Sequence, residues 1–136
     1  DGMFGIGEYV KYAGYGYSDL YTQATKNLGL TYGFTFQDYM SEIDAGRVVM
    51  IHVEGHSMFG YGYNKDTQMV YLHDTWYLGE DTMTWGGSYS GMGMWGVTCL
   101  TLTGGEPAAP VPEPATMLLL GSGLLGLAGL RRRFKK

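Results

Sequence analysis

Cysteine and basic residues are scarce in the first hundred positions of this sequence. Cys99 is the only cysteine among 136 residues, which excludes an intrachain disulfide and a zinc site built from several cysteines. Residues 1–103 carry four lysines and arginines against eleven acidic side chains, a net charge near −7. We therefore expect no nucleic-acid binding from this part of the chain, because that function needs a basic surface to displace counterions.

Proline is also missing from the first 106 residues, and all four prolines stand between positions 107 and 114. This change in composition divides the chain. Residues 1–103 are rich in glycine, tyrosine and methionine, which favours short strands and tight loops. Residues 104–114 read as an extended linker, residues 115–130 carry no charge, and residues 131–136 are a basic cluster.

Two helices are predicted in the first third of the chain. The stronger lies between Thr35 and Gly46, where Thr35 and Asp38 have the spacing of a capping box and Gly46 supplies a C-terminal stop. Its apolar residues follow the spacing of one helix face: Phe36, Tyr39, Met40 and Ile43. A second, shorter helix is predicted from about Ser18 to Leu28.

Four strands are predicted after these helices. Residues 47–53 form a short β-branched apolar run that favours an inner strand. Residues 57–63 and 68–73 flank the polar turn "NKDT" and predict a β-hairpin. Residues 95–102 predict a last strand. Helices followed by antiparallel strands indicate an α+β fold class.

The run "HVEGH" places His52 and His56 four residues apart, which raises the question of a metal site. Zinc peptidases of the His-Glu-x-x-His type hold both histidines on one helix face. Here Glu54 is misplaced and the preceding residues are strand-like, so the two imidazoles would not share a helix face. The "HVE" element also lacks the Pro-Cys-x-x-Cys partner of zinc deaminases. We expect neither a metal nor another cofactor, and we read His52 and His73 as sheet residues.

His56 opens one strand of the predicted hairpin, and Asp74 directly follows the other. An antiparallel hairpin brings two such positions close together. A catalytic imidazole needs a partner that fixes its tautomer, so His56 and Asp74 are candidate catalytic residues. The alternative is that both are ordinary turn residues, and spacing alone leaves both interpretations open.

The run "IDAGRVVMIHVEGHSMFGYGYNKDTQMVYLHDTW" resembles the papain-like peptidases related to the bacteriocin-processing, double-glycine-leader peptidases. The resemblance covers roughly residues 34–102. It depends on Ile43, Gly46, Arg47 and Val48, on Gly55-His56, on Gly62-Tyr63, and on Asp74. It implies the C-terminal antiparallel-sheet half of a papain-like cysteine peptidase fold, with a peptide substrate. In such a site His56 would be the general base and Asp74 its orienting partner.

The same resemblance calls for a cysteine at a helix N-terminus well upstream of His56, where its pKa would be lowered. Cys99 lies downstream, in an apolar strand, and reads as a small buried hydrophobe. Because the chain starts at Asp1 rather than Met, we expect it to be the C-terminal part of a longer peptidase-like product. The alternative is a non-catalytic surface or matrix binding protein that keeps the fold. The three tryptophans could line a groove or pack in the core: Trp76, Trp85 and Trp95.

The last 26 residues resemble the PEP-CTERM sorting signal. The matching parts are the box Val111, Pro112, Glu113 and Pro114, a short hydrophobic helix over 115–130, and the cluster Arg131, Arg132 and Arg133. Sixteen helical residues span about 24 Å, slightly less than the roughly 30 Å hydrocarbon core of a bilayer. The resemblance implies an exported Gram-negative protein, transiently anchored in the inner membrane by one transmembrane helix. An exosortase would then cut the tail and leave the body at the cell surface or outside the cell.

Overall fold

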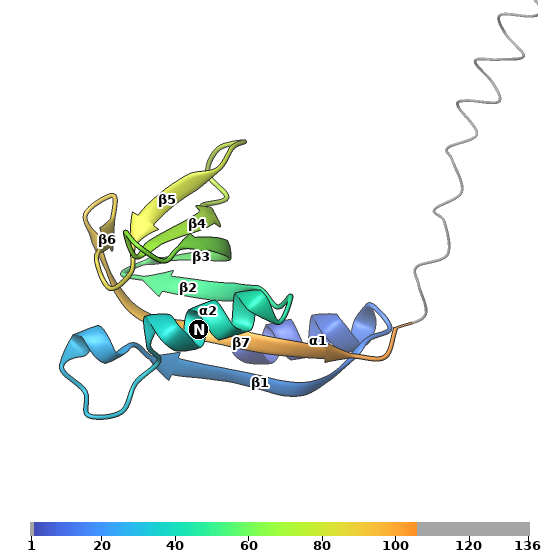
Figure 1. The fold of residues 1–136 in the computed structure, drawn as a ribbon. Coiled ribbons are helices and arrows are strands. Elements are labelled where there is room, and N and C mark those ends of the chain that lie inside the picture. The colour runs from blue at the N-terminus through green and yellow to red at the C-terminus, as the bar shows by residue number, and fades with distance from the viewer. Residues whose placement is uncertain (1, 106–136) are drawn as a thin grey trace, which may run out of the picture. The chain divides into compact units, whose positions relative to one another are not determined.

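The computed structural model describes residues 2–105, in which one antiparallel sheet is flanked by two α-helices (Figure 1). The elements are α1 (Met3–Tyr12), β1 (Gly16–Ala24), a 3-10 turn (Lys26–Leu28), α2 (Phe36–Asp44), β2 (Val49–Val53), β3 (His56–Asn64), β4 (Met69–His73), β5 (Asp81–Thr84), β6 (Ser88–Tyr89) and β7 (Met92–Thr103). The strand order is β1-β7-β2-β3-β4-β5, and β6 pairs with β7.

The predicted inner strand and hairpin are confirmed. β2 lies between β7 and β3, so both of its edges are hydrogen-bonded. β3 and β4 form the expected hairpin, and the Asn64 side chain stabilises its turn by accepting hydrogen bonds from the backbone N–H groups of Asp66 and Thr67. The fold class is therefore α+β, with a sheet that dominates the described residues.

The capping box at the start of α2 is also confirmed. The Thr35 hydroxyl accepts a hydrogen bond from the Asp38 backbone N–H at 3.2 Å, and the Asp38 carboxylate accepts one from the Thr35 N–H at 2.8 Å. These two bonds satisfy backbone donors that have no partner within the helix.

The two helices lie on opposite faces of the sheet, with α2 in front of it in Figure 1 and α1 behind. Thr22 of β1 donates a hydrogen bond to the sulfur of Met3 in α1. Its neighbours Tyr21 and Gln23 instead line a small pocket together with Asp38 and Ser41 of α2. Because successive strand residues point to opposite faces, this alternation places each helix on its own side.

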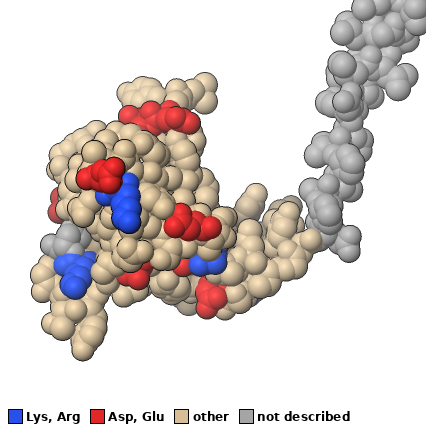
Figure 2. Space-filling view, in the orientation of Figure 1, with Lys and Arg blue, Asp and Glu red and all other residues tan. Residues whose placement is uncertain are grey.

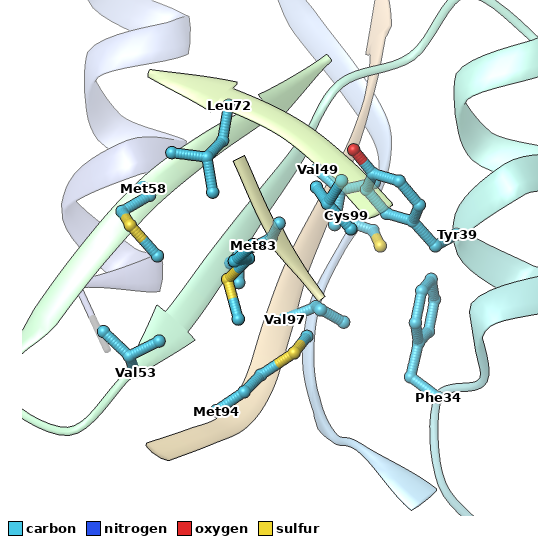
Figure 3. Packing of buried hydrophobic residues seen from close by; sticks show 12 residues of the cluster. Phe34, Tyr39, Val49, Val53, Met58, Leu72, Met83, Met94, Val97 and Cys99 are labelled. Atoms are coloured by element: carbon cyan, nitrogen blue, oxygen red, sulfur yellow. The ribbon is translucent and has the colours of Figure 1, made fainter. Parts of the chain in front are cut away.

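The hydrophobic core fills the space between the sheet and α2 (Figure 3). Tyr39 of α2 is fully buried and donates a hydrogen bond to the Gly62 carbonyl at 2.9 Å. A Cβ atom at Gly60 would lie 2.7 Å from the Tyr39 hydroxyl, so only glycine leaves room for this ring. The buried cluster comprises Phe34, Tyr39, Val49, Ile51, Val53, Met58, Val70, Leu72, Met83, Met94, Val97 and Cys99.

The helix predicted from Ser18 to Leu28 is wrong. Residues 16–24 form β1, and only the short 3-10 turn after it is helical. β1 pairs with β7 along its length, for example Leu20 with Leu100, and this tertiary pairing outweighs the local pattern. Helix α1 and the short strands β5 and β6 were not predicted. Gly7 allows α1 to lie close to the sheet, since a Cβ there would be 3.1 Å from Leu20.

Residues 106–114 of the predicted linker, the predicted transmembrane segment 115–130 and the basic cluster lie outside the described residues. Within residues 2–105, no helix combines the length and apolar character that a membrane crossing requires. The domain limits at 103, 114 and 130 remain predictions.

Candidate functional site

His56 and Asp74 meet at one end of the β3–β4 hairpin, as their positions predicted. His56 is the first residue of β3, and Asp74 directly follows β4, whose last residue His73 pairs with Phe59 of β3. The Nε2 atom of His56 lies 2.6 Å from the backbone carbonyl oxygen of Asp74. The Trp76 ring stacks on the half-buried imidazole, with centroids 4.3 Å apart and planes at 20°.

His56 donates its hydrogen bond to the backbone carbonyl of Asp74 and not to the Asp74 carboxylate. One carboxylate oxygen, Oδ1, accepts hydrogen bonds from the backbone N–H groups of Trp76 at 3.0 Å and Tyr77 at 3.3 Å. The other, Oδ2, accepts one from the Tyr89 hydroxyl at 2.8 Å. The sequence predicted a carboxylate–imidazole pair. The structure differs because an aspartate before a turn bonds the N–H groups that follow it.

Asp74 is 2% exposed, and its environment still favours the ionised form. Burial raises the pKa of the carboxyl, but the hydrogen bonds from Tyr89, Trp76 and Tyr77, together with the nearby His56, outweigh burial and hold the pKa below its ordinary value. A carboxylate therefore remains beside the imidazole at neutral pH.

The bond to Asp74 determines which nitrogen of His56 can act as a base. A carbonyl oxygen can only accept a hydrogen bond, so Nε2 must carry the proton in the pair with Asp74. A neutral imidazole has one N–H, and Nδ1 is then the unprotonated nitrogen. The geometry thus provides a ring with a fixed tautomer and a basic Nδ1 atom.

An open hollow of about 510 Å³ lies next to this pair. Its lining combines the adjoining ends of β2 and β3 and the turn between them with one residue of the loop after β4 and one of β7. The lining residues are His52, Val53, Gly55, His56, Ser57, Thr75 and Trp95. A group that reacts with His56 could approach the ring through this hollow.

His52 lies within β2 and is 1% exposed. Its Nδ1 atom is 2.8 Å from the Ser57 hydroxyl, and its Nε2 atom is 2.7 Å from the Thr98 hydroxyl. The Thr98 hydroxyl is in turn 2.6 Å from that of Thr22. Burial lowers the pKa of His52, so the ring is neutral. These contacts join β3, β2, β7 and β1 across the α1 face of the sheet.

His73 lies within β4, as predicted, and stacks on Tyr61 with ring centroids 4.9 Å apart. Its Nδ1 atom bonds the Gly79 carbonyl at 2.7 Å. Among the described residues, no group of three histidine, cysteine or acidic side chains is placed to hold a metal ion.

Cys99 lies in β7, and its buried position agrees with the prediction of a small core hydrophobe. Burial raises the pKa of its thiol to about 11, so the thiol is protonated at neutral pH. The tryptophans have separate environments. Trp85 packs against the core near Tyr39, Trp95 stacks on His52, and Trp76 covers His56.

Two residues of the site, Trp76 and Tyr89, were not assigned to it from the sequence. The contact of Trp76 with His56 depends on how the loop after β4 folds back. Tyr89 reaches Asp74 from β6, a strand of two residues that was not predicted. The Ser90-Gly91 pair was a signal for a tight hairpin turn, but that signal would not have identified Asp74 as the partner.

Comparison with known proteins identifies two regions of the chain. A family model for the PEP-CTERM protein-sorting motif matches residues 110–133, and a model for the Peptidase_C39 like family matches residues 2–93. No curated protein and no solved structure gives a significant match. The sorting motif is a signal recognised by exosortase, and it implies export and processing at the membrane, then a surface or extracellular location. By its larger match, which covers residues 2–93, this chain belongs to the Peptidase_C39 like family.

Proposed function

We propose that His56 is the general base of a cysteine-peptidase site and that Asp74 is the residue that orients it. The bond between His56 Nε2 and the Asp74 carbonyl carries this proposal, because it leaves Nδ1 as the proton acceptor. The Trp76 ring stacked on the imidazole restricts its rotation and shields one of its faces from water. A peptide is the expected substrate.

The proposed reaction is peptide hydrolysis by acyl transfer. Nδ1 of His56 takes the proton of a cysteine thiol, and the thiolate sulfur attacks the peptide carbonyl carbon. The carbon–nitrogen bond then breaks, and the leaving amine takes the proton from the imidazolium. Water next attacks the thioester carbon while Nδ1 takes one of its protons. The carbon–sulfur bond breaks, the acid is released, and the thiolate takes the proton back from the imidazolium.

The thiol for this reaction is not supplied by residues 1–136. Cys99 is buried in β7, and a thiol with a pKa near 11 is protonated and unreactive. We infer that a parent enzyme carries the nucleophile on a segment upstream of Asp1. A helix N-terminus would suit it, because the helix dipole lowers the pKa of a thiol.

The proposal is tested by reading the gene upstream of Asp1 and expressing its full product. We expect a cysteine there. We also expect that this cysteine is required for hydrolysis of a peptide mixture, with the products detected by mass spectrometry. The His56→Ala variant should lose this activity, while His73→Ala, which alters an exposed histidine of the same sheet, should keep it. A full product without an upstream cysteine, or full activity in His56→Ala, would rule the enzyme proposal out.

The alternative function is a non-catalytic binding or matrix protein at the cell surface. It is favoured by the lack of an available thiol in this sequence and by the exposed aromatic side chain of Trp76, which is 48% exposed. Under this alternative, the full product would bind peptides or matrix material without turnover. The His56→Ala change would then leave binding largely intact.

We also propose how the tail acts in sorting. Residues 104–114 would be a linker that presents the box Val111–Pro114 to exosortase. Residues 115–130 would anchor the chain transiently in the inner membrane, with Arg131–Arg133 on the cytoplasmic side. In a host with exosortase, mass spectrometry of the exported protein should find a C-terminus near the box. An intact tail on the exported protein would contradict this role.

A further inference from the structure

Tyr89 connects the His56–Asp74 pair to a third part of the sheet. Its hydroxyl donates a hydrogen bond to Oδ2 of Asp74 at 2.8 Å. Its ring lies 6.0 Å from that of Trp76, the residue stacked on His56. Tyr89 therefore contacts both of the groups that contact the imidazole.

The position of Tyr89 is set by a tight hairpin. Tyr89 of β6 pairs with Met92 of β7, and the two residues between them, Ser90 and Gly91, have φ angles of 48° and 81°. Positive φ at both positions is the conformation of a type I′ turn, whose twist matches that of the paired strands. β7 is also paired with the inner strand β2, so the hairpin carries Tyr89 on a well-anchored element.

The other hydrogen bonds to the Asp74 carboxylate come from its own loop. Trp76 and Tyr77 donate through their backbone N–H groups, so they would move together with Asp74 if the loop shifted. Thr75 in this loop has a φ of 68°, a conformation that is uncommon for a threonine. A loop with a strained residue needs an external contact to keep one conformation, and the Tyr89 hydroxyl provides one.

The carbonyl that contacts His56 belongs to the same residue as this carboxylate. Fixing the Asp74 side chain from two directions limits rotation of its backbone, and so limits where the carbonyl oxygen can lie. Burial, together with the neighbouring carboxylates of Asp74 and Asp81, raises the pKa of Tyr89, so its hydroxyl remains a donor at and well above neutral pH.

We propose that Tyr89 is a positioning residue that holds the Asp74 carbonyl against His56 Nε2. The inference rests on the proposed function of His56, since positioning matters to catalysis only if His56 is the base. The hydrogen bond between His56 and the Asp74 carbonyl can be measured without catalysis, on the chain of residues 1–136.

The test measures, by NMR, how fast the imidazole Nε2–H proton of His56 exchanges with water in the wild-type protein and in Tyr89→Phe. This variant removes one oxygen atom and keeps the ring. We expect a protected Nε2–H signal in the wild type, and an exchange rate at least ten times faster in Tyr89→Phe. Replacing Tyr89 with 4-aminophenylalanine, which restores an N–H donor at the same place, should recover most of the protection.

Tyr63→Phe is the matched control, because the Tyr63 hydroxyl donates to Asp44 at 2.7 Å, another tyrosine–aspartate bond, away from His56. In Tyr63→Phe, the exchange rate of the His56 Nε2–H proton should equal that of the wild type. Unchanged exchange in Tyr89→Phe, or equal acceleration in both variants, would overturn the inference. If instead the NMR result is as expected but the full gene product hydrolyses no peptide, the proposed function fails and the positioning contact stands.

Discussion

The side chain of His56 and the backbone carbonyl of Asp74 form a 2.6 Å hydrogen bond that fixes the imidazole tautomer. A carbonyl is present at every residue, so the identity of residue 74 matters through the turn that its side chain builds. The Asp74 carboxylate accepts hydrogen bonds from the backbone N–H groups of Trp76 and Tyr77, and these bonds set the direction of the Asp74 carbonyl. A contact through the carbonyl therefore predicts different effects for Asp74→Asn and Asp74→Ala, whereas a direct carboxylate–imidazole pair would predict the same effect for both.

Asp74→Asn should largely keep the His56 geometry, whereas Asp74→Ala should lose it. The asparagine amide oxygen can accept the same backbone N–H groups, and its NH2 group can donate to the Tyr89 hydroxyl oxygen, while alanine leaves all of these groups without a partner. We expect the NMR signal of the His56 Nε2–H proton to persist in Asp74→Asn. In Asp74→Ala, this signal should be lost because the proton exchanges rapidly with water. Loss of the signal in both variants would instead show that the carboxylate charge is required.

His52 should make the fold sensitive to mild acid. Burial lowers the pKa of His52 in the folded protein, so the unfolded chain binds a proton first as pH falls below about 6.5. Protonation then favours unfolding, and stability decreases from that pH down to the lowered pKa.

The measurement is the free energy of unfolding by urea at several pH values for the wild type and His52→Gln. The loss of stability below pH 6.5 should be smaller in His52→Gln, whose amide can still bond Ser57 and Thr98. The control is His73→Gln, which alters an exposed residue. Identical pH profiles for the wild type and His52→Gln would contradict the assignment.

Cys99 should resist thiol reagents in the folded protein. The thiol is 2% exposed, and burial raises its pKa to about 11, so little thiolate is present at neutral pH. We expect reaction with a disulfide reagent to be limited by unfolding, and to become fast in urea. Rapid reaction under native conditions would mean that β7 opens locally or that the thiol is accessible.

Thr35→Ala should destabilise the protein by about 1 kcal/mol, because it removes the side chain that caps α2. Ser41→Ala on the same helix is the control. Its hydroxyl only bonds the Gln37 carbonyl one turn earlier, an interaction that adds little to helix stability. Chemical unfolding measures both changes. Equal small effects would indicate that packing of Tyr39 alone holds the helix in place.

The parts of the fold that depend on local chemistry were predictable from the sequence. α2 has a cap, an apolar face and a glycine stop within twelve residues, and β2 is a short β-branched run. β1 was not predictable in this way. Residues 16–24 become a strand because β7, about eighty positions later, supplies a partner along their whole length. Without that partner the local pattern could equally indicate a helix.

The proximity of His56 and Asp74 was predictable from the sequence, but the atoms that form the contact were not. The hairpin brought His56 and Asp74 together, since both flank neighbouring strands. The choice between carbonyl and carboxylate depends on the turn after β4, where Thr75 adopts a positive φ. Tyr89 could not be assigned because its contact with Asp74 joins strand β6 to the loop after β4, and no short-range sequence pattern indicates such a contact.

The most direct test of the central claim is the alkylation rate, at pH 6 to 7, of the thiol that we propose lies upstream of Asp1 in the full gene product. A base at His56 should lower the pKa of that thiol. We therefore predict that iodoacetamide reacts at least ten times faster with the wild type than with His56→Ala, while His73→Ala matches the wild type. Equal rates in the wild type and His56→Ala, or a full product whose only thiol is Cys99, would contradict the account.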